Sequence, residues 1–415
     1  MIAGAPVLQE LSPEQSGSRP CPVCRGSRHT LLYRQKFEQL SGARLLDGYA
    51  VVICQDCGVG FADGIPEQAV FDRYYRELSK YDSLDHRSAG PFVEPRFQDI
   101  AAIAVRFIQG GDTRVLEIGC ASGGLLRALR DRGVRNLYGS DPSPACIRAA
   151  AELFGIAGTV GTVFTVPRPD PLYDFLILTG VMEHIRDLDR TVERFHDLLS
   201  ERGRVFLEVP DASRYEPQLD APFQELSLEH INFFSPASLA NLMRARGFRA
   251  LETGRTMRPL HEASCPCTYG VFERAAEISP VEYDSETESG LRRYIEGCRT
   301  EDERVRTAIA EAIAPGECVV IWGVGAHTLR LLASGGLDAS RVALFVDSNP
   351  NYQHQQLMGI RVAPPAELRG RSEPILISSR GFQREIEHEI RNIMGLPNRL
   401  ILLYGAPAGG RLNGA

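Results

Sequence analysis

The sequence has no long apolar run, no excess of basic residues and no basic N-terminal start followed by an apolar core. A helix that crosses a bilayer needs about 20 consecutive apolar residues, so we predict neither a membrane span nor a signal peptide. The formal net charge is -7. Proteins that bind DNA or RNA over a broad surface normally carry a basic excess, so the charge disfavours nucleic acid as the main partner.

The remaining composition is that of an ordinary globular protein. Of the 415 residues, 43% are hydrophobic and 24% are charged. At about 100–200 residues per domain, this length predicts two or three domains. The sequence shows no internal repeat. We expect a cytoplasmic enzyme, a monomer or homodimer, that acts on a small molecule.

Cysteine forms one clear motif. The chain has 10 cysteines, four of which make two CxxC pairs, Cys21 with Cys24 and Cys54 with Cys57. Each pair forms a tight turn whose thiolates can bind one metal ion, and two such turns complete a tetrahedral site that suits zinc. Free thiols or two disulfides are the alternative. We predict a structural Zn²⁺ ion without a catalytic role, because a site closed by four cysteines has no open position.

From residue 114 onward, short apolar runs alternate with helical segments. This alternation predicts an α/β fold, with a parallel sheet covered by helices on both faces. A polar, acidic helical stretch follows, and a second, smaller alternation begins near residue 316. We expect a loose N-terminus at 1–20, a zinc-binding domain at 21–65, a Rossmann-like core domain at 66–275, a linking helix at 276–315 and a smaller Rossmann-like domain at 316–415.

The strongest catalytic signal is residues 116–124, LEIGCASGG, where a strand ends in a glycine-containing turn that lets a ligand approach the backbone. About 20 residues later, Asp141 ends a second strand and can accept hydrogen bonds from both hydroxyls of a ribose. A dinucleotide site would read GxGxxG and hold a pyrophosphate, which Glu117 would repel. The same acid suits the sulfonium and ammonium groups of S-adenosylmethionine.

This pattern resembles the first two motifs of class I methyltransferases. The resemblance implies that S-adenosylmethionine contacts Glu117, Gly119, Cys120, Ser122, Gly123 and Asp141. Glu183 and His184 follow the third strand, in a stretch that lies next to the cofactor in the same superfamily. We therefore predict that both line the cofactor pocket.

Glu229 and His230 follow the fourth strand, before a helix that Ser235 is expected to cap. Histidine has an unperturbed pKa of about 6.5 and can accept a proton at neutral pH. His230 is therefore the candidate base, and Glu229 is placed to act with it. A packed structural histidine is the alternative.

The order of these motifs resembles the zinc-containing, three-domain sugar C-methyltransferases that act on nucleotide-linked keto-deoxysugars. The resemblance covers nearly the whole chain. It implies that His230 removes a carbon-bound proton next to a ketone and that the resulting enolate takes the methyl group. The run SLEH that ends at His230 stands where the family has Tyr-His-Glu-His. The family also uses a tyrosine from the segment before the core, for which Tyr81 is the candidate.

Residues 322–328, WGVGAHT, open a second strand–turn–helix unit, and the next strand ends at Asp347. In the resembled family this domain helps to hold the nucleotide diphosphate, and N–H groups at a helix N-terminus can bind phosphate. We expect nucleotide contacts from Gly323, Gly325, His327 and Asp347. A lobe that only closes the cleft is the alternative.

Other functions stay open from the sequence. An O- or N-methyltransferase of a carbohydrate or natural-product precursor would use His230 on a hydroxyl or amine. A zinc-ribbon binding protein would carry a non-catalytic methyltransferase fold, and a NAD-dependent enzyme would work at the C-terminal glycine turn. Cys265 and Cys267 have no matching ligands in the sequence and are expected to be packed thiols.

Overall fold

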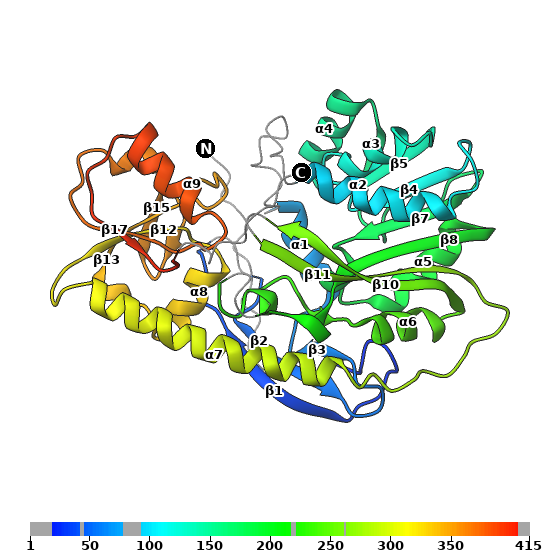
Figure 1. The fold of residues 1–415 in the computed structure, drawn as a ribbon, viewed down its shortest axis with the longest axis horizontal. Helices are drawn as coiled ribbons and strands as arrows, with labels where there is room; N and C mark the ends of the chain where they lie inside the picture. The colour runs from blue at the N-terminus through cyan, green and yellow to red at the C-terminus, as the bar shows by residue number, and fades with distance from the viewer. Residues whose placement is uncertain (1–18, 42–44, 78–92, 217–220, 261–262, 406–415) are drawn as a thin grey trace, which may run out of the picture.

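The computed structural model describes residues 19–41, 45–77, 93–216, 221–260 and 263–405. Figure 1 shows two lobes, each built around a sheet, with the N-terminal strands and the long helix α7 running below them. Among the described residues, no helix is both long and apolar enough to cross a membrane. The expected loose N-terminus falls almost wholly outside the described residues.

The larger lobe contains a seven-stranded sheet of order β10-β11-β8-β7-β4-β5-β6. Strands β4 to β8 are parallel, which confirms the predicted α/β core. Strand β11 runs antiparallel between β8 and β10. The strands are β4 (Arg114–Ile118), β5 (Asn136–Asp141), β6 (Ala157–Val160), β7 (Tyr173–Thr179), β8 (Leu199–Pro210), β10 (Phe248–Leu260) and β11 (Ala263–Arg274).

Helices cover both faces of this sheet, with α2, α3 and α4 on one side and α5 and α6 on the other (Figure 1). The cap predicted for α6 is present, because Ser235 accepts a hydrogen bond from Ser238 N at 3.2 Å. The helices are α1 (Gln68–Glu77), α2 (Val93–Ala104), α3 (Gly124–Arg130), α4 (Pro144–Phe154), α5 (Leu188–Leu198) and α6 (Pro236–Arg244).

The smaller lobe contains a six-stranded sheet of order β14-β15-β13-β12-β16-β17, parallel except for β14. Helix α7 (Thr287–Ala312) leads into it and corresponds to the predicted linking helix. The other elements are β12 (Val319–Trp322), α8 (Ala326–Ala333), β13 (Val342–Val346), β14 (Gln356–Leu357), β15 (Ile360–Ala363), β16 (Ile375–Ile377), α9 (Gln383–His388) and β17 (Leu400–Leu402).

The N-terminal strands form a third sheet that contacts both lobes. Its antiparallel strands are β1 (His29–Lys36), β2 (Gly48–Cys54), β3 (Gly60–Asp63) and β9 (Asn232–Phe233). The cysteine end shares a hydrophobic core with the seven-stranded sheet, whereas Phe37 and Tyr49 share a core with α7 and the smaller lobe. Glu38 N also donates to Leu329 O at 3.1 Å. The N-terminal sheet therefore packs as a brace between the lobes.

Candidate active site

The turn after β4 exposes its backbone. Gly119 has φ +79°, and a Cβ at this position would lie 2.6 Å from Cγ2 of Val181. Gly123 has φ +82° directly before α3. The side chain of Cys120 packs against Gly139 of β5, where an added Cβ would lie 2.6 Å from Cys120 Sγ. Residue 119 needs glycine for both its conformation and its surroundings.

Two carboxylates flank this turn. Asp141 accepts hydrogen bonds from Ala121 N through Oδ2 and from Ser143 N through Oδ1, both at 2.9 Å. Glu117 is 2% exposed, and its Oε2 has no hydrogen-bond partner among the described residues. Burial, reinforced by the charge of Asp141, raises the pKa of Glu117 to about 8, while Arg96 acts in the opposite direction. A buried carboxylate that lacks donors favours a cationic ligand beside it.

The segment after β7 adds a carboxylate and an imidazole. Glu183 and His184 lie in the short turn η5 (Met182–His184). A carboxylate oxygen of Glu183 and one ring nitrogen each of His184 and His230 all lie within 4.8 Å of one another. The rings of His184 and His230 meet edge to face, with centroids 5.0 Å apart. The fold thus places His230, which follows the fourth strand, next to Glu183 and His184, which follow the third.

The carboxylates near His230 have different partners. Glu225, in the turn η7 (Gln224–Leu226), has its Oε2 3.6 Å from Nδ1 of His230. Glu229 accepts a hydrogen bond from the Tyr74 hydroxyl through Oε1 at 3.1 Å. Because of this distance, Glu225 and not Glu229 is placed to orient His230. Glu225 was not among the residues predicted from the sequence. No local motif marks residue 225, because only the fold brings it to the site.

Helix α1 brings two tyrosines to this cluster. The ring of Tyr75 meets that of His184 edge to face, at 5.9 Å between centroids. Burial and the charge of Glu229 raise the pKa of Tyr74 far above its usual value, so its hydroxyl keeps its proton and donates. The predicted catalytic tyrosine, Tyr81, lies outside the described residues.

Comparison with known families identifies the chemistry of this lobe. Residues 86–253 match the model of a protein family described as a methyltransferase domain. The matched stretch contains the β4 turn, Asp141, the η5 turn and His230. The protein is an S-adenosylmethionine-dependent methyltransferase. No curated protein is significantly similar to the chain.

Two solved structures illustrate what this methyltransferase is similar to. A 1,6-didemethyltoxoflavin-N1-methyltransferase from Burkholderia thailandensis is 18% identical, with 54% of this chain and 97% of that chain covered and a TM-score of 0.40. Magnesium protoporphyrin IX methyltransferase from Synechocystis is 17% identical, with 50% and 97% covered and a TM-score of 0.36. At these scores neither structure bears on the acceptor.

The methyltransferase also brings its CxxC pairs together. Cys21 Sγ lies 3.6 Å from Cys57 Sγ, and Cys24 Sγ lies 3.4 Å from Cys54 Sγ. All four sulfur atoms lie within 4.8 Å of one another. Zinc–sulfur bonds of about 2.3 Å in a tetrahedron place sulfurs about 3.8 Å apart, so the set has the dimensions of a zinc site. Cys54 ends β2 and Cys57 lies in the turn before β3, so the set lies at one end of the brace.

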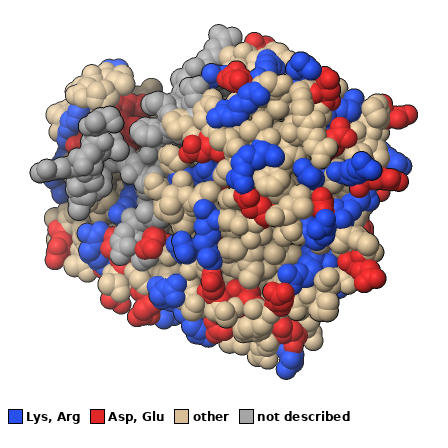
Figure 2. All heavy atoms as spheres, turned by 45° about the vertical axis from the view of Figure 1, so that its right-hand side comes forward, with Lys and Arg blue, Asp and Glu red and all other residues tan. Residues whose placement is uncertain are grey.

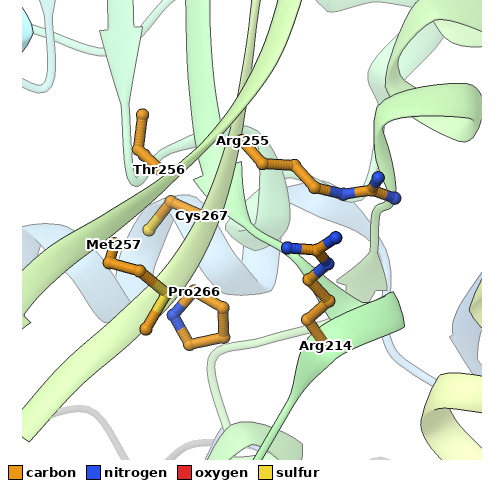
Figure 3. A pocket seen from close by; sticks show the side chains of 6 residues that line it. All are labelled: Arg214, Arg255, Thr256, Met257, Pro266 and Cys267. Carbon is orange, nitrogen blue, oxygen red and sulfur yellow. The ribbon is translucent and has the colours of Figure 1, made fainter.

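An open cavity of about 550 Å³ is lined by residues of the η6 turn (Ala212–Arg214), the β10–β11 hairpin and α7, among them Arg214, Tyr215 and Arg293. A smaller pocket of about 130 Å³ shares Arg214 with it, and Figure 3 shows Arg214 and Arg255 entering that pocket from different elements. Arg255 pairs with Asp211 at 2.9 Å. Within the described part of the chain, Arg214 and Arg293 make no ion pair.

Tyr215 connects this cavity with the histidine cluster. Burial raises its pKa well above the usual value, and the charges of Glu225, Cys265 and Glu183 raise it further. The ring of Tyr215 meets that of Tyr294 at 5.4 Å between centroids, and the Tyr294 hydroxyl accepts a hydrogen bond from Glu225 N at 3.0 Å. The cavity is thereby linked through Glu225 to His230. Two guanidinium groups are therefore available to an anionic part of a substrate.

The second glycine turn has a related backbone. Asp347 accepts hydrogen bonds from Val324 N through Oδ2 and from Asn349 N through Oδ1, both at 2.8 Å. A Cβ on Gly325 would meet nothing within 4 Å, which leaves the start of α8 accessible.

His327 of this turn is 5% exposed and packed inside the lobe. Its Nδ1 lies 3.1 Å from Ser378 Oγ, and its Nε2 lies 3.0 Å from the Tyr404 hydroxyl. Burial lowers the pKa of His327 to about 3, so the ring is neutral at physiological pH. The ring therefore supports the turn, and nucleotide contacts, which stay a prediction, would come from the backbone at Gly323 and Gly325.

Proposed function

We propose that the protein transfers a methyl group from S-adenosylmethionine to a nucleotide-linked sugar, with the turn after β4 as the cofactor site. The observation that carries the cofactor assignment is the buried, donor-poor carboxylate of Glu117 beside a glycine turn. The cofactor's cationic amino acid end satisfies this carboxylate, and Asp141 is the ribose partner.

The glycines at 119 and 123, with Cys120 and Ser122, present backbone rather than bulk to the cofactor. When bound, S-adenosylmethionine supplies an electrophilic methyl group. The protein's contribution is to hold the acceptor in line with that group and to take up its proton. His230 is the proposed base, and Glu225 orients its ring through Nδ1.

The acceptor assignment rests on the neighbouring cavity. Arg214 and Arg293 line a space large enough for a sugar phosphate, and Tyr215 of the same lining is linked through Tyr294 and Glu225 to His230. Guanidinium groups suit a diphosphate. On the face shown in Figure 2, acidic and basic side chains are intermixed, so the positive charge offered to a ligand is confined to small sites there.

We further propose that the four cysteines hold one Zn²⁺, which fixes the end of the brace against the methyltransferase sheet. Metal bound in this way contributes directly to folding. Residues 21–65 would then act as a zinc module, residues 66–275 as the catalytic domain and residues 316–415 as the lobe that holds the nucleotide. The packing of β1 and β2 on that lobe supports a fixed distance between nucleotide and cofactor.

The experiment is methyl transfer in deuterated water, with nucleotide-linked 3-keto and 4-keto deoxysugars as acceptors and products read by NMR. We expect a new C–CH₃ group and deuterium exchange at the attacked carbon. Both should disappear in His230→Asn and persist in His388→Asn, a matched change at an exposed histidine. An O–CH₃ or N–CH₃ product would replace C-methylation with the alternative chemistry. Failure to bind S-adenosylhomocysteine would contradict the cofactor site.

A further inference from the structure

The cluster of Glu183, His184 and His230 has a feature that proton transfer alone does not explain. Nδ1 of His184 lies 3.0 Å from the backbone carbonyl oxygen of Glu229. A carbonyl oxygen only accepts, so the proton of a neutral His184 is on Nδ1 and its lone pair is on Nε2. That Nε2 faces Oε1 of Glu183 at 3.8 Å. A lone pair and a carboxylate oxygen repel each other unless a positive group lies between them.

Glu183 itself points to the same conclusion. The residue is 3% exposed, and its Oε2 has no hydrogen-bond partner among the described residues. A buried carboxylate oxygen without a donor is costly, so it is normally paired or bound to a metal. The nearest imidazole offers this carboxylate a lone pair, while His230 completes a set whose ligand atoms all lie within 4.8 Å.

We propose that Glu183, His184 and His230 bind a divalent metal ion that coordinates oxygen atoms of the methyl acceptor. Two imidazoles and one carboxylate suit a first-row divalent ion and leave open positions for ligand oxygens. The carbonyl of Glu229 fixes the His184 tautomer, as outer partners of metal-bound histidines do. His230 contributes the third ligand atom of this set.

The ion would give the site a specificity that the cofactor turn lacks. A pair of adjacent oxygens, such as a hydroxyl next to a carbonyl or two neighbouring hydroxyls, can fill two open positions together. This role of the ion rests on the proposed function, because it requires a sugar-like acceptor. The binding of the ion itself requires neither acceptor nor cofactor. A nitrogen of His230 that binds metal cannot accept the acceptor's proton, so in the metal-bound site the proton goes to another base, and the metal replaces the role proposed above for His230.

The test uses the full chain with Mn²⁺ as the probe, followed by electron paramagnetic resonance without cofactor or acceptor. Mn²⁺ prefers oxygen and imidazole ligands, so it leaves the cysteine cluster undisturbed. We expect one Mn²⁺ bound per chain, with nitrogen couplings from imidazole. Glu183→Gln and His184→Asn should each weaken binding at least tenfold. Glu193→Gln, the same change at an exposed residue of α5, should leave binding unaltered.

Absence of Mn²⁺ binding, or binding that survives both substitutions, would overturn the inference. Near-UV circular dichroism shows whether each variant is folded, and a variant that is not folded is replaced by His230→Asn. The outcome is independent of the acceptor. If the protein binds Mn²⁺ but methylates no nucleotide sugar, the metal site stands and the sugar assignment is wrong. If it methylates a nucleotide sugar but binds no Mn²⁺, the sugar assignment stands and the metal site is wrong.

Discussion

The two glycine turns of this protein share a backbone design and differ in one side chain. In both, a strand ends at a glycine with positive φ, Gly119 or Gly323, and an aspartate at the end of the next strand accepts N–H groups from the turn and from its own strand end. Two residues before the glycine, the first turn has the buried acid Glu117 and the second has the buried Ile321. The backbone alone therefore does not choose the ligand.

The strand residue sets the charge that each turn prefers. An acid with a pKa of about 8 becomes fully charged only when a cation or a donor approaches it, which suits the amino acid end of S-adenosylmethionine. The apolar strand end of the second turn leaves its helix N-terminus as the main electrostatic feature, which suits an anion. The N-terminal sheet packs against both lobes and so connects the two turns.

The largest expected effect comes from breaking the brace on which both turns depend. Cys57→Ser removes a proposed zinc ligand. Cys57 is 1% exposed and belongs to the hydrophobic core that the brace shares with the seven-stranded sheet. We expect a loss of about 3–5 kcal/mol in unfolding free energy, because a partly coordinated, buried site loses most of its metal affinity. Denaturant unfolding measures this loss. Cys318→Ser, at an exposed cysteine, is the control and should be neutral. Equal stability of the two variants would exclude a structural metal.

The next effect separates the turns directly. Gly119→Ala forces a Cβ into a left-handed conformation, 2.6 Å from Val181. Strain and overpacking together cost about 3 kcal/mol, so affinity for S-adenosylhomocysteine should fall roughly 100-fold. Gly325→Ala adds a Cβ in open space and should leave that affinity unchanged. Isothermal titration calorimetry compares the two. A similar loss in both variants would mean that the turns do not differ in ligand.

Glu117→Gln tests the side chain that distinguishes the turns. It keeps the shape and removes the charge that the cationic cofactor is expected to meet. A hydrogen bond to a charged group contributes about 2 kcal/mol, so affinity for S-adenosylmethionine should fall roughly 30-fold. Stability should not fall, because the substitution removes a buried carboxylate without donors. An unaltered affinity in equilibrium dialysis would remove Glu117 from the cofactor site.

The smallest effect is a pH dependence with a defined sign. The folded protein holds the Glu117 proton up to a pKa of about 8, whereas the unfolded chain loses it near the ordinary glutamate pKa of 4.5. The native state binds more protons between these values, so the Glu117 contribution makes stability fall as pH rises through this window and level off above it. Cofactor affinity should rise over the same window, because the cation binds the ionised form. Both slopes should be weaker in Glu117→Gln, and unchanged slopes would assign them to another group.

The sequence was informative where structure is local. Strand–helix alternation predicted the parallel core, the Ser235 cap and the helix that became α7, because each depends on neighbouring residues. It did not reveal β6, the β14–β15 hairpin or α9, which are short or weakly patterned. The docking of β1 and β2 on the distant lobe was also unforeseen, since contacts such as Glu38 N to Leu329 O have no local signature.

The site divides in the same way. The proposed cofactor residues at the β4 turn lie in one contiguous motif, and this motif and Asp141 could be selected from their spacing. Glu225 and Tyr74 could not, because their roles arise only when η7 and α1 pack beside His230 and Glu229. The hydroxyl of Tyr74 has no sequence motif around it that would indicate a partner.

Whether the cofactor binds at the first glycine turn and not at the second can be measured by hydrogen exchange of both turns, with and without S-adenosylhomocysteine. With S-adenosylhomocysteine bound, we expect slower exchange in the peptides that contain residues 119–124 and 139–143. Peptides that contain residues 323–328 should not change. Protection at 323–328 with none at 119–124 would place the cofactor in the smaller lobe and contradict the assignment of the two turns.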